Sequence, residues 1–167
     1  MFNSIDLRKP TLSDARTILK WENNPENWSV SDNDSEYSLS DIENLIESFG
    51  PLKDADQMRY LIIDQSSKLL GAIDLFGIDD KKASVGILVA NKEHRNKGIA
   101  YQALLLLESI CLDQSDIRCL NATVSIDNGS SITLFNKAGY QKVDTRREKL
   151  KNGKYIETIL FEKWLKE

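Results

Sequence analysis

The stretch of residues 85–100, VGILVANKEHRNKGIA, constrains the fold more than any other part of the chain. An apolar run typical of a strand leads into a short basic loop, a glycine and the start of a helix. The first turn of a helix has backbone N–H groups without intrahelical partners, and the helix dipole makes that end positive. Because Lys92, Arg95 and Lys97 lie nearby and Gly98 allows close approach to the backbone, this junction predicts a phosphate or pyrophosphate site.

Neither of two common phosphate-binding patterns accounts for this junction. The chain has no GxxxxGK[ST] sequence of a P-loop and no GxGxxG sequence of a dinucleotide-binding fold. A helix start at which Gly98 only permits a turn is the plainer interpretation, so the anion site needs support from elsewhere in the chain.

Hydrophobic periodicity on both sides of the junction predicts a mixed architecture. Short alternating apolar runs are typical of strands, and apolar residues at i, i+3 and i+4 are typical of helices. We expect a single mixed α/β (α+β) domain over residues 1–167, with about seven strands and about four helices. The expected strands are residues 4–8, 58–64, 69–76, 83–90, 118–126, 143–150 and 154–165, and the helices begin near Thr11 or Ser13, at a capping box of residues 40–43, at Lys97 and at Ser130.

Composition excludes several classes of protein. A length of 167 residues with 41% hydrophobic content suits one globular domain. No apolar run approaches the ~18 residues of a membrane span, and the first residues lack the features of a secretory signal. Two cysteines, Cys111 and Cys119, do not make a disulfide framework. We therefore expect a cytoplasmic protein without a membrane partner, and the sequence leaves open whether it is a monomer or a homodimer.

Charge is unevenly distributed along the chain. The net charge of −4 argues against a nucleic-acid partner. Residues 21–52 contain eight acidic residues and no Lys or Arg, whereas basic residues gather in residues 92–97 and 137–154. The acidic segment suits a cationic ligand, and a solvated acidic face is an equally good interpretation. His94 is the only histidine, so we expect no metal site.

Three segments resemble one enzyme family. Residues 95–100, RNKGIA, match the [RQ]-x-x-G-x-[GA] motif, and residues 128–140 match the pattern N-x-x-[AS]-x-x-[LF]-[YF]-x-K-x-G-[FY]. Together with the hairpin at residues 152–155, they resemble the GCN5-related N-acetyltransferases (GNAT). The resemblance is to the branch of ribosomal-protein and spermidine or diamine acetyltransferases, and it covers essentially the whole chain.

The resemblance implies a sheet that splays between its fourth and fifth strands, with acetyl-coenzyme A in the gap. Backbone amides at the start of the helix would hold the pyrophosphate, and an N–H of Leu88 or Val89 would polarise the thioester carbonyl. The residues expected to contact coenzyme A are Leu88, Val89, Ala90, Asn91, Arg95, Asn96, Lys97, Gly98, Ile99, Ala100, Tyr101, Asn128, Ser131, Phe135 and Lys137.

The reaction implied is direct attack of a primary amine on the thioester in a ternary complex. The acidic segment favours a small cationic amine, of polyamine or amino-sugar type, over the N-terminus of a protein or peptide. Relatives use a tyrosine as the acid where this chain has Phe135, which cannot donate a proton. A coenzyme A-binding regulatory module with little catalysis is therefore the alternative from another class.

Candidates for the two proton transfers follow from local spacing. Ser131 is the first choice for the acid because it lies one helical turn before Phe135, and Ser130, Tyr101 and Tyr140 are alternatives. Strand alternation places Asp74 on the same side as Leu70 and Ala72, and an acid among apolar neighbours suits a general base. Glu22 and Glu26 are the other candidate bases. The residues expected to contact the acceptor are Glu22, Glu26, Trp28 and Asp74.

Overall fold

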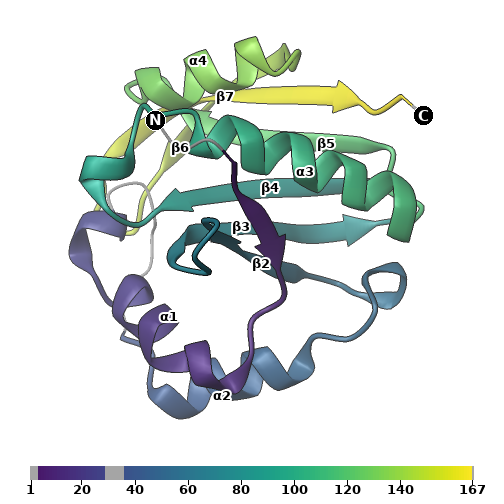
Figure 1. Ribbon diagram of the computed structural model, residues 1–167. Helices are drawn as coiled ribbons and strands as arrows, with labels where there is room; N and C mark the ends of the chain where they lie inside the picture. Colours follow the sequence, from purple (N-terminus) through teal and green to yellow (C-terminus); the bar gives the residue numbers. More distant parts are fainter. Residues whose placement is uncertain (1–3, 29–35, 167) are drawn as a thin grey trace.

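The computed structural model describes residues 4–28 and 36–166, without the side chain of Trp28. Within them the chain forms a seven-stranded sheet in the order β1-β2-β3-β4-β5-β7-β6, with four α-helices (Figure 1). The mixed α/β class is thereby confirmed. The strands are β1 (Asp6–Arg8), β2 (Met58–Ile63), β3 (Leu69–Asp79), β4 (Lys82–Val89), β5 (Cys119–Ser125), β6 (Gln141–Lys149) and β7 (Tyr155–Trp164).

The helices follow the predicted periodicity, and 3-10 turns join them to the strands. No helix in the described ranges is long and apolar enough to cross a bilayer. The α-helices are α1 (Ala15–Glu22), α2 (Leu39–Ser48), α3 (Ile99–Gln114) and α4 (Gly129–Lys137), and the 3-10 turns are η1 (Leu12–Asp14), η2 (Pro25–Trp28), η3 (Leu52–Asp54) and η4 (Lys92–His94).

The start of α2 differs from the prediction. Its capping box is formed by Ser38 and Asp41, not by the expected pair at positions 40 and 43. The Asp41 N–H donates to Ser38 Oγ at 3.1 Å, and the Ser38 N–H donates to Asp41 Oδ2 at 2.8 Å. Both positions carry the same pattern, and the earlier start places Leu39 against the core.

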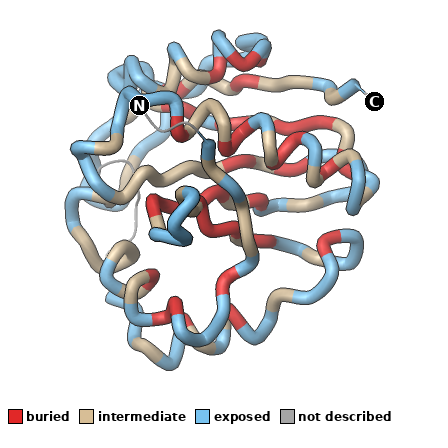
Figure 2. Tube along the Cα trace, in the orientation of Figure 1, coloured by how far each residue is buried: buried red, intermediate tan, exposed pale blue. Residues whose placement is uncertain are grey.

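Two apolar clusters lie on opposite faces of the sheet. The buried residues, red in Figure 2, gather along the central strands. Tyr60 and Ile62 belong to the cluster under α3 and α4, whereas Leu61 between them belongs to the cluster under α1 and α2. Successive strand residues point to opposite faces, so the two helical layers sandwich the sheet. The helices expected to contact coenzyme A, α3 and α4, therefore lie on one face of the sheet. Helix α1, which carries the expected acceptor residue Glu22, lies on the other face.

A bulge in the β2–β3 pair changes one sequence expectation. The register shifts between Ile62 and Ile63, and Leu70 joins the cluster under α3 while Ala72 joins the cluster under α1 and α2. The prediction that Leu70 shares a side with Asp74 is therefore wrong. An inserted residue reverses the alternation beyond it, which periodicity alone does not reveal.

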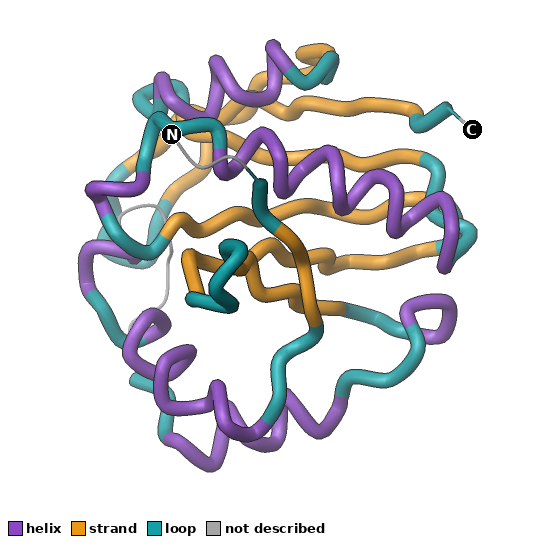
Figure 3. The backbone as a smooth tube through the Cα atoms, in the orientation of Figure 1, coloured by secondary structure: helices purple, strands orange, loops and turns teal. Residues whose placement is uncertain are grey.

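The sheet splays where the resemblance placed the opening. Strands β4 and β5 are parallel, and only residues 82–84 of β4 pair with residues 119–121 of β5. Every residue of β5 pairs with β7 on its other side. The remainder of β4 therefore has no strand partner on the side of β5. From the end of β4 the chain continues into η4 and the start of α3 (Figure 3).

Candidate active site

A cavity of about 560 Å³ lies beside the unpaired end of β4. Its walls come from β4, the junction of η4 with α3, α4 and η2. Eleven of the residues expected to contact coenzyme A line it. They are Leu88, Val89, Arg95, Asn96, Gly98, Ile99, Ala100, Tyr101, Asn128, Ser131 and Lys137.

Four of the expected cofactor residues do not line the cavity. The Ala90 N–H donates to a β3 carbonyl at 3.0 Å, and the Asn91 side chain caps η4. Lys97 is exposed beside the cavity, and Phe135 is buried in the core. Sequence reasoning missed other lining residues, among them Ile87, Thr133 and Leu134, whereas Ser130, named only as an alternative acid, also lines the cavity. Those in α4 could have been found, since positions three and four apart share a helix face.

The backbone of β4 distinguishes the two proposed amide donors. Residues along an antiparallel ladder direct their N–H and C=O groups alternately to one neighbour and the other. Because the Ala90 N–H faces β3, the Leu88 groups face β3 as well, and the Val89 groups face the gap. The Val89 carbonyl accepts a hydrogen bond from Arg95 Nε at 3.1 Å. Val89 is therefore the better candidate for an amide that meets a ligand.

Gly71 allows the close approach of β3 and β4 at this point. A Cβ on Gly71 would overlap the Leu88 carbonyl oxygen. Only a residue without a side chain fits here, so Gly71 fixes the path of β4 where it borders the cavity.

The junction of η4 with α3 forms a cradle for an anion. Asn96 and Gly98 have φ angles of 60° and 84°, in the left-handed region that glycine adopts readily. The Gln102 N–H is bonded to the Gly98 carbonyl at 3.1 Å, and the amides ahead of it precede the helical ladder. A Cβ on Gly98 would have no atom nearer than Gln102 Nε2 at 4.0 Å, so the space above the glycine is open. The donors and the space fit a phosphate group.

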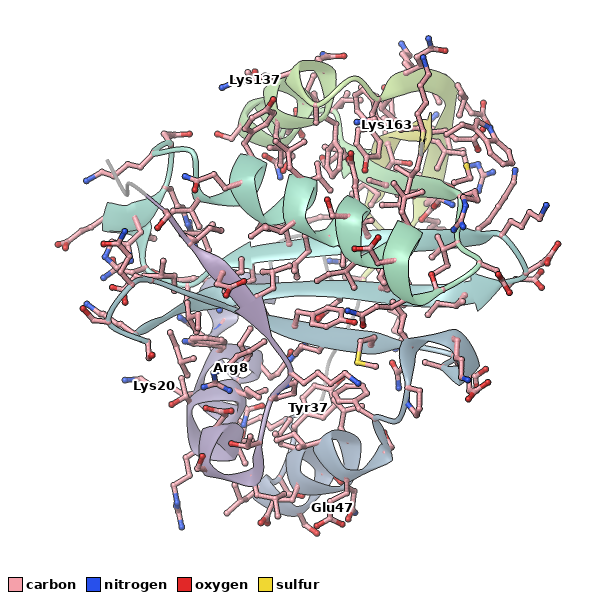
Figure 4. All side chains as sticks on the ribbon, turned by 45° about the vertical axis from the view of Figure 1, so that its right-hand side comes forward. Arg8, Lys20, Tyr37, Glu47, Lys137 and Lys163 are labelled. Carbon is pink, nitrogen blue, oxygen red and sulfur yellow. The ribbon has the colours of Figure 1, made fainter. Side chains whose placement is uncertain are left out.

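The cavity's two helical walls meet through a cation–π contact. Lys137, labelled in Figure 4, lies at the end of α4. Its Nζ is 4.4 Å from the centre of the Tyr101 ring in the first turn of α3. Asn128 caps α4 by accepting the Ser131 N–H at 3.1 Å. Because Arg95 also lines the cavity, this wall carries positive charge beside the helix start.

The aromatic residues of the second motif belong to the core. The Phe135 ring contacts Tyr140 edge-on, with centroids 5.1 Å apart, and stacks on Phe161 at 5.8 Å. Tyr140 Oη donates to Glu108 Oε2 at 2.9 Å, and burial together with the Glu108 charge raises the pKa of Tyr140. Tyr140 is therefore a poor proton donor, whereas Ser131 and Tyr101 line the cavity.

A second cavity, of about 570 Å³, shares no lining residue with the first. It lies by the second half of α3 and the end of β7. Of its two acidic residues, Glu108 accepts hydrogen bonds from Tyr140 and from Lys163 Nζ, the latter at 2.8 Å, and Glu162 lies 3.8 Å from Lys82 Nζ. Lys163, labelled in Figure 4, also donates to the Ala138 carbonyl at 2.8 Å. These hydrogen bonds connect α3, the end of α4 and β7, so Glu108 and Lys163 already have partners within the fold.

Two of the expected acceptor residues meet at Arg59 of β2. Arg59 Nε and Nη2 donate to the Asp74 carboxylate at 2.7 and 2.8 Å, and Arg59 Nη1 lies 2.7 Å from Glu22 Oε1. Burial opposes the charge of Arg59, but the two carboxylates outweigh it and raise the pKa of the guanidinium. The expected apolar surroundings of Asp74 are therefore wrong, because Arg59, 15 residues earlier, reaches it from the neighbouring strand.

Glu26 is the expected acceptor residue that lines the cavity. Its Oε1 lies 3.1 Å from Lys92 Nζ, and both side chains are exposed. Asn27, also at the cavity, donates from Nδ2 to the Trp21 carbonyl at 2.9 Å. The expected contact of Trp28 depends on a side chain outside the described part of the chain.

The arrangement of these elements defines a class of protein. The Acetyltransferase (GNAT) domain family matches residues 4–141. The chain therefore belongs to the GNAT acetyltransferase family.

Individual proteins show the same relationship at lower identity. An SPbeta prophage-derived uncharacterized N-acetyltransferase, YokL of Bacillus subtilis, is 28% identical over 108 residues, which are 64% of this chain and 61% of that protein. An N-acetyltransferase 9-like protein of Nematostella vectensis is 25% identical over 105 residues, 55% of this chain and 53% of that protein. The matched region thus spans little more than half the length of each relative.

Solved structures share the fold over almost the whole chain. Spermidine N-acetyltransferase from Vibrio cholerae, in complex with CoA and spermine, has a TM-score of 0.84 at 20% identity and covers 96% of this chain and 95% of its own. The spermidine/spermine N-acetyltransferase SpeG of the same organism, in complex with manganese ions, has a TM-score of 0.77 at 20% identity, with coverage of 96% and 92%. At this identity the likeness shows the fold alone.

Proposed function

We propose that the protein transfers the acetyl group of acetyl-coenzyme A to a primary amine. The observation that carries the proposal is the cavity beside the unpaired edge of β4, lined in part by the first turn of α3. Acetyl-coenzyme A supplies a thioester, which is an activated acyl group. The protein needs to hold the phosphates, polarise the carbonyl and move two protons.

The cofactor wall is suited to the first two tasks. The amides of Ile99, Ala100 and Tyr101 together with the dipole of α3 bind the pyrophosphate, and Arg95 and Lys137 add charge. The Val89 N–H faces the gap and polarises the thioester carbonyl, as an oxyanion-hole donor does.

Proton transfer falls to residues on the other walls. An amine of lysine type is protonated at pH 7, with a pKa near ~10, so a base must accept a proton. The two candidate bases are Glu26, which lines the cavity, and Asp74, which Arg59 holds by two hydrogen bonds close to the end of β4. Ser131 is the proposed donor to the leaving thiolate. A thiol with a pKa of about 8.5 also leaves readily without an acid.

A small cationic amine is the proposed acceptor, of polyamine or amino-sugar type, and a peptide N-terminus is the alternative. The carboxylate of Glu26 in η2 lines the cavity and supports a cation there, and Glu22 of α1 is a second carboxylate, held by Arg59. The structural neighbour solved with spermine is a precedent on the same fold. A coenzyme A-binding module with little catalysis is the second candidate, because Phe135 supplies no hydroxyl at the position of the family's acid.

Thiol release from acetyl-coenzyme A tests the proposal directly. A panel of amines, amino sugars and N-terminal peptides is offered at saturating cofactor, and coenzyme A binding is measured by calorimetry. We expect binding in the micromolar range and thiol release with small amines. Binding without release for any acceptor would support the non-catalytic module, and absence of binding at millimolar coenzyme A would reject both candidates.

A further inference from the structure

An ion cluster of Glu22, Arg59 and Asp74 links α1 to the sheet. Arg59 bonds both carboxylates, at 2.7 Å to Glu22 and at 2.7 and 2.8 Å to Asp74. The Arg59 side chain is 15% exposed, and the two carboxylates are about twice as exposed, at 29% and 30%. The guanidinium is therefore the inner member, and the carboxylates form the accessible surface.

The cluster does not itself line the cavity, but strand pairing and one hydrogen bond place it close to the wall that β4 and η2 contribute. Asp74 pairs with Gly86 of β4, and Ala72 pairs with the cavity-lining Leu88. Those pairs share a sheet face and lie two residues apart, about 7 Å along the strand. Gly86 has no side chain of its own, and the Phe76 ring lies 3.6 Å from the position that a Cβ would take. On the helical side, Asn27 lines the cavity and donates to the carbonyl of the residue before Glu22.

The charges here nearly cancel. Glu22, Glu26 and Asp74 are acidic, and Arg59 and Lys92 are paired with them. These five described groups carry a net charge of −1. One ammonium group therefore finds a compensating charge, whereas each further ammonium would lose hydration without a matching carboxylate.

We propose, resting on the acetyl-transfer function above, that Arg59 is a specificity-determining residue. By neutralising one carboxylate it adapts the acceptor side to amines with a single positive charge, such as a monoamino sugar, and disfavours polyamines. Glu22 and Glu26 of the acidic segment are thus paired with bases from elsewhere in the chain, Arg59 and Lys92.

Two amines of equal chain length test this charge rule. Butylamine carries one ammonium and 1,4-diaminobutane carries two, and kcat/KM for each is measured by thiol release. We expect the native protein to prefer butylamine. In Arg59→Met the net charge becomes −2, and the ratio of kcat/KM should shift toward the diamine by about tenfold, the size of one charge interaction at short range.

A charge-restoring variant separates specificity from structure. Glu22→Gln makes the net charge zero, and kcat/KM for both amines should fall by about tenfold. The double variant Arg59→Met with Glu22→Gln returns to −1, and the native preference should return with it. A purely structural Arg59 would give losses that add instead of cancelling.

Arg8→Met is the matched control, because Arg8 makes the same two-bond contact with Asp14 outside the cavity, at 2.8 and 2.9 Å. This control should leave the ratio unchanged. Coenzyme A affinity, measured in every variant, reports an intact cofactor wall. Thiol release with a diamine preference in the native protein, or with an unchanged ratio in Arg59→Met, would overturn the charge rule alone. Absence of thiol release with every amine would overturn acetyl transfer and this proposal together.

Discussion

The cofactor wall and the acceptor side of the cavity differ in the polar groups that they present to a ligand. Along the cofactor wall the donors are backbone amides, set by a strand end, two residues with positive φ and a helix start. On the acceptor side the polar groups are side chains held in ion pairs, and Glu26 and Lys92 are 66 residues apart. A backbone site follows from a local sequence pattern, whereas an ion-pair site requires the fold to bring distant residues together.

Gly98→Glu is the strongest test of the backbone wall. The carboxylate would stand in the open space above the glycine, at the positive end of α3, where the phosphates are proposed to bind. We expect coenzyme A affinity to fall by at least about a hundredfold, because like charges would be juxtaposed in a confined site. Isothermal titration measures the loss.

Gly153→Glu is the control for that substitution. Gly153 has a φ of 85°, nearly the 84° of Gly98, and lies in the hairpin between β6 and β7 with no atom within 4 Å of a built Cβ. The substitution Gly153→Glu introduces the same charge and the same backbone strain at a position away from the cavity. Equal losses in the two variants would mean that Gly98 acts through strain alone.

Gly71→Ala tests whether the path of β4 shapes the wall. The added methyl would overlap the Leu88 carbonyl, so β4 must shift next to Val89. We expect a loss of about 1–3 kcal/mol in the free energy of unfolding, as for overpacking, and a lower kcat/KM. Gly50→Ala, where a Cβ meets no atom within 4 Å, is the matched control in urea unfolding. Native activity in Gly71→Ala would show that the approach of the two strands is unimportant.

Phe135→Tyr addresses the step between the two regions, the proton given to the leaving thiolate. The ring is 4% exposed and packs on Tyr140 and Phe161, so a hydroxyl would be buried in an apolar setting. We expect a destabilisation of about 1 kcal/mol and no gain in kcat. A clear gain in kcat would show that the hydroxyl reaches the reacting thiol and that the chain has lost the family's acid.

The smallest expected effect concerns the ion pair between Arg8 of β1 and Asp14 of η1. Hydrogen bonds from Arg8 lower the pKa of Asp14, although its burial acts in the opposite direction. A carboxyl whose pKa is lowered by folding stabilises the protein above its ordinary pKa near ~3.9 and loses that contribution as the pH falls below it. The stability difference between native protein and Arg8→Met should be constant from about pH 7 to 5 and shrink in more acidic solution. Thermal unfolding across that range measures it, and a constant difference at low pH would contradict the assignment.

The contrast between the two regions also explains what could be predicted from sequence. The motif around Gly98 and the cap at Asn128 are local, and the expected splay of the sheet is confirmed. The side of Leu70 was mispredicted, because a bulge shifts the strand phase without a clear mark in residue type. Arg59 was not predicted as a partner of Asp74, because the pairing register of β2 and β3 is a property of the folded sheet.

The short contact between β4 and β5 gives β4 two unlike edges. Beyond residue 84, one edge is bonded to β3, and the other borders the gap. In hydrogen exchange, the Leu88 amide should be protected as part of the ladder, whereas the Ile87 and Val89 amides should exchange quickly. Exchange rates would thus alternate along one strand. If coenzyme A occupies the gap, adding it should slow the exchange of Ile87 and Val89.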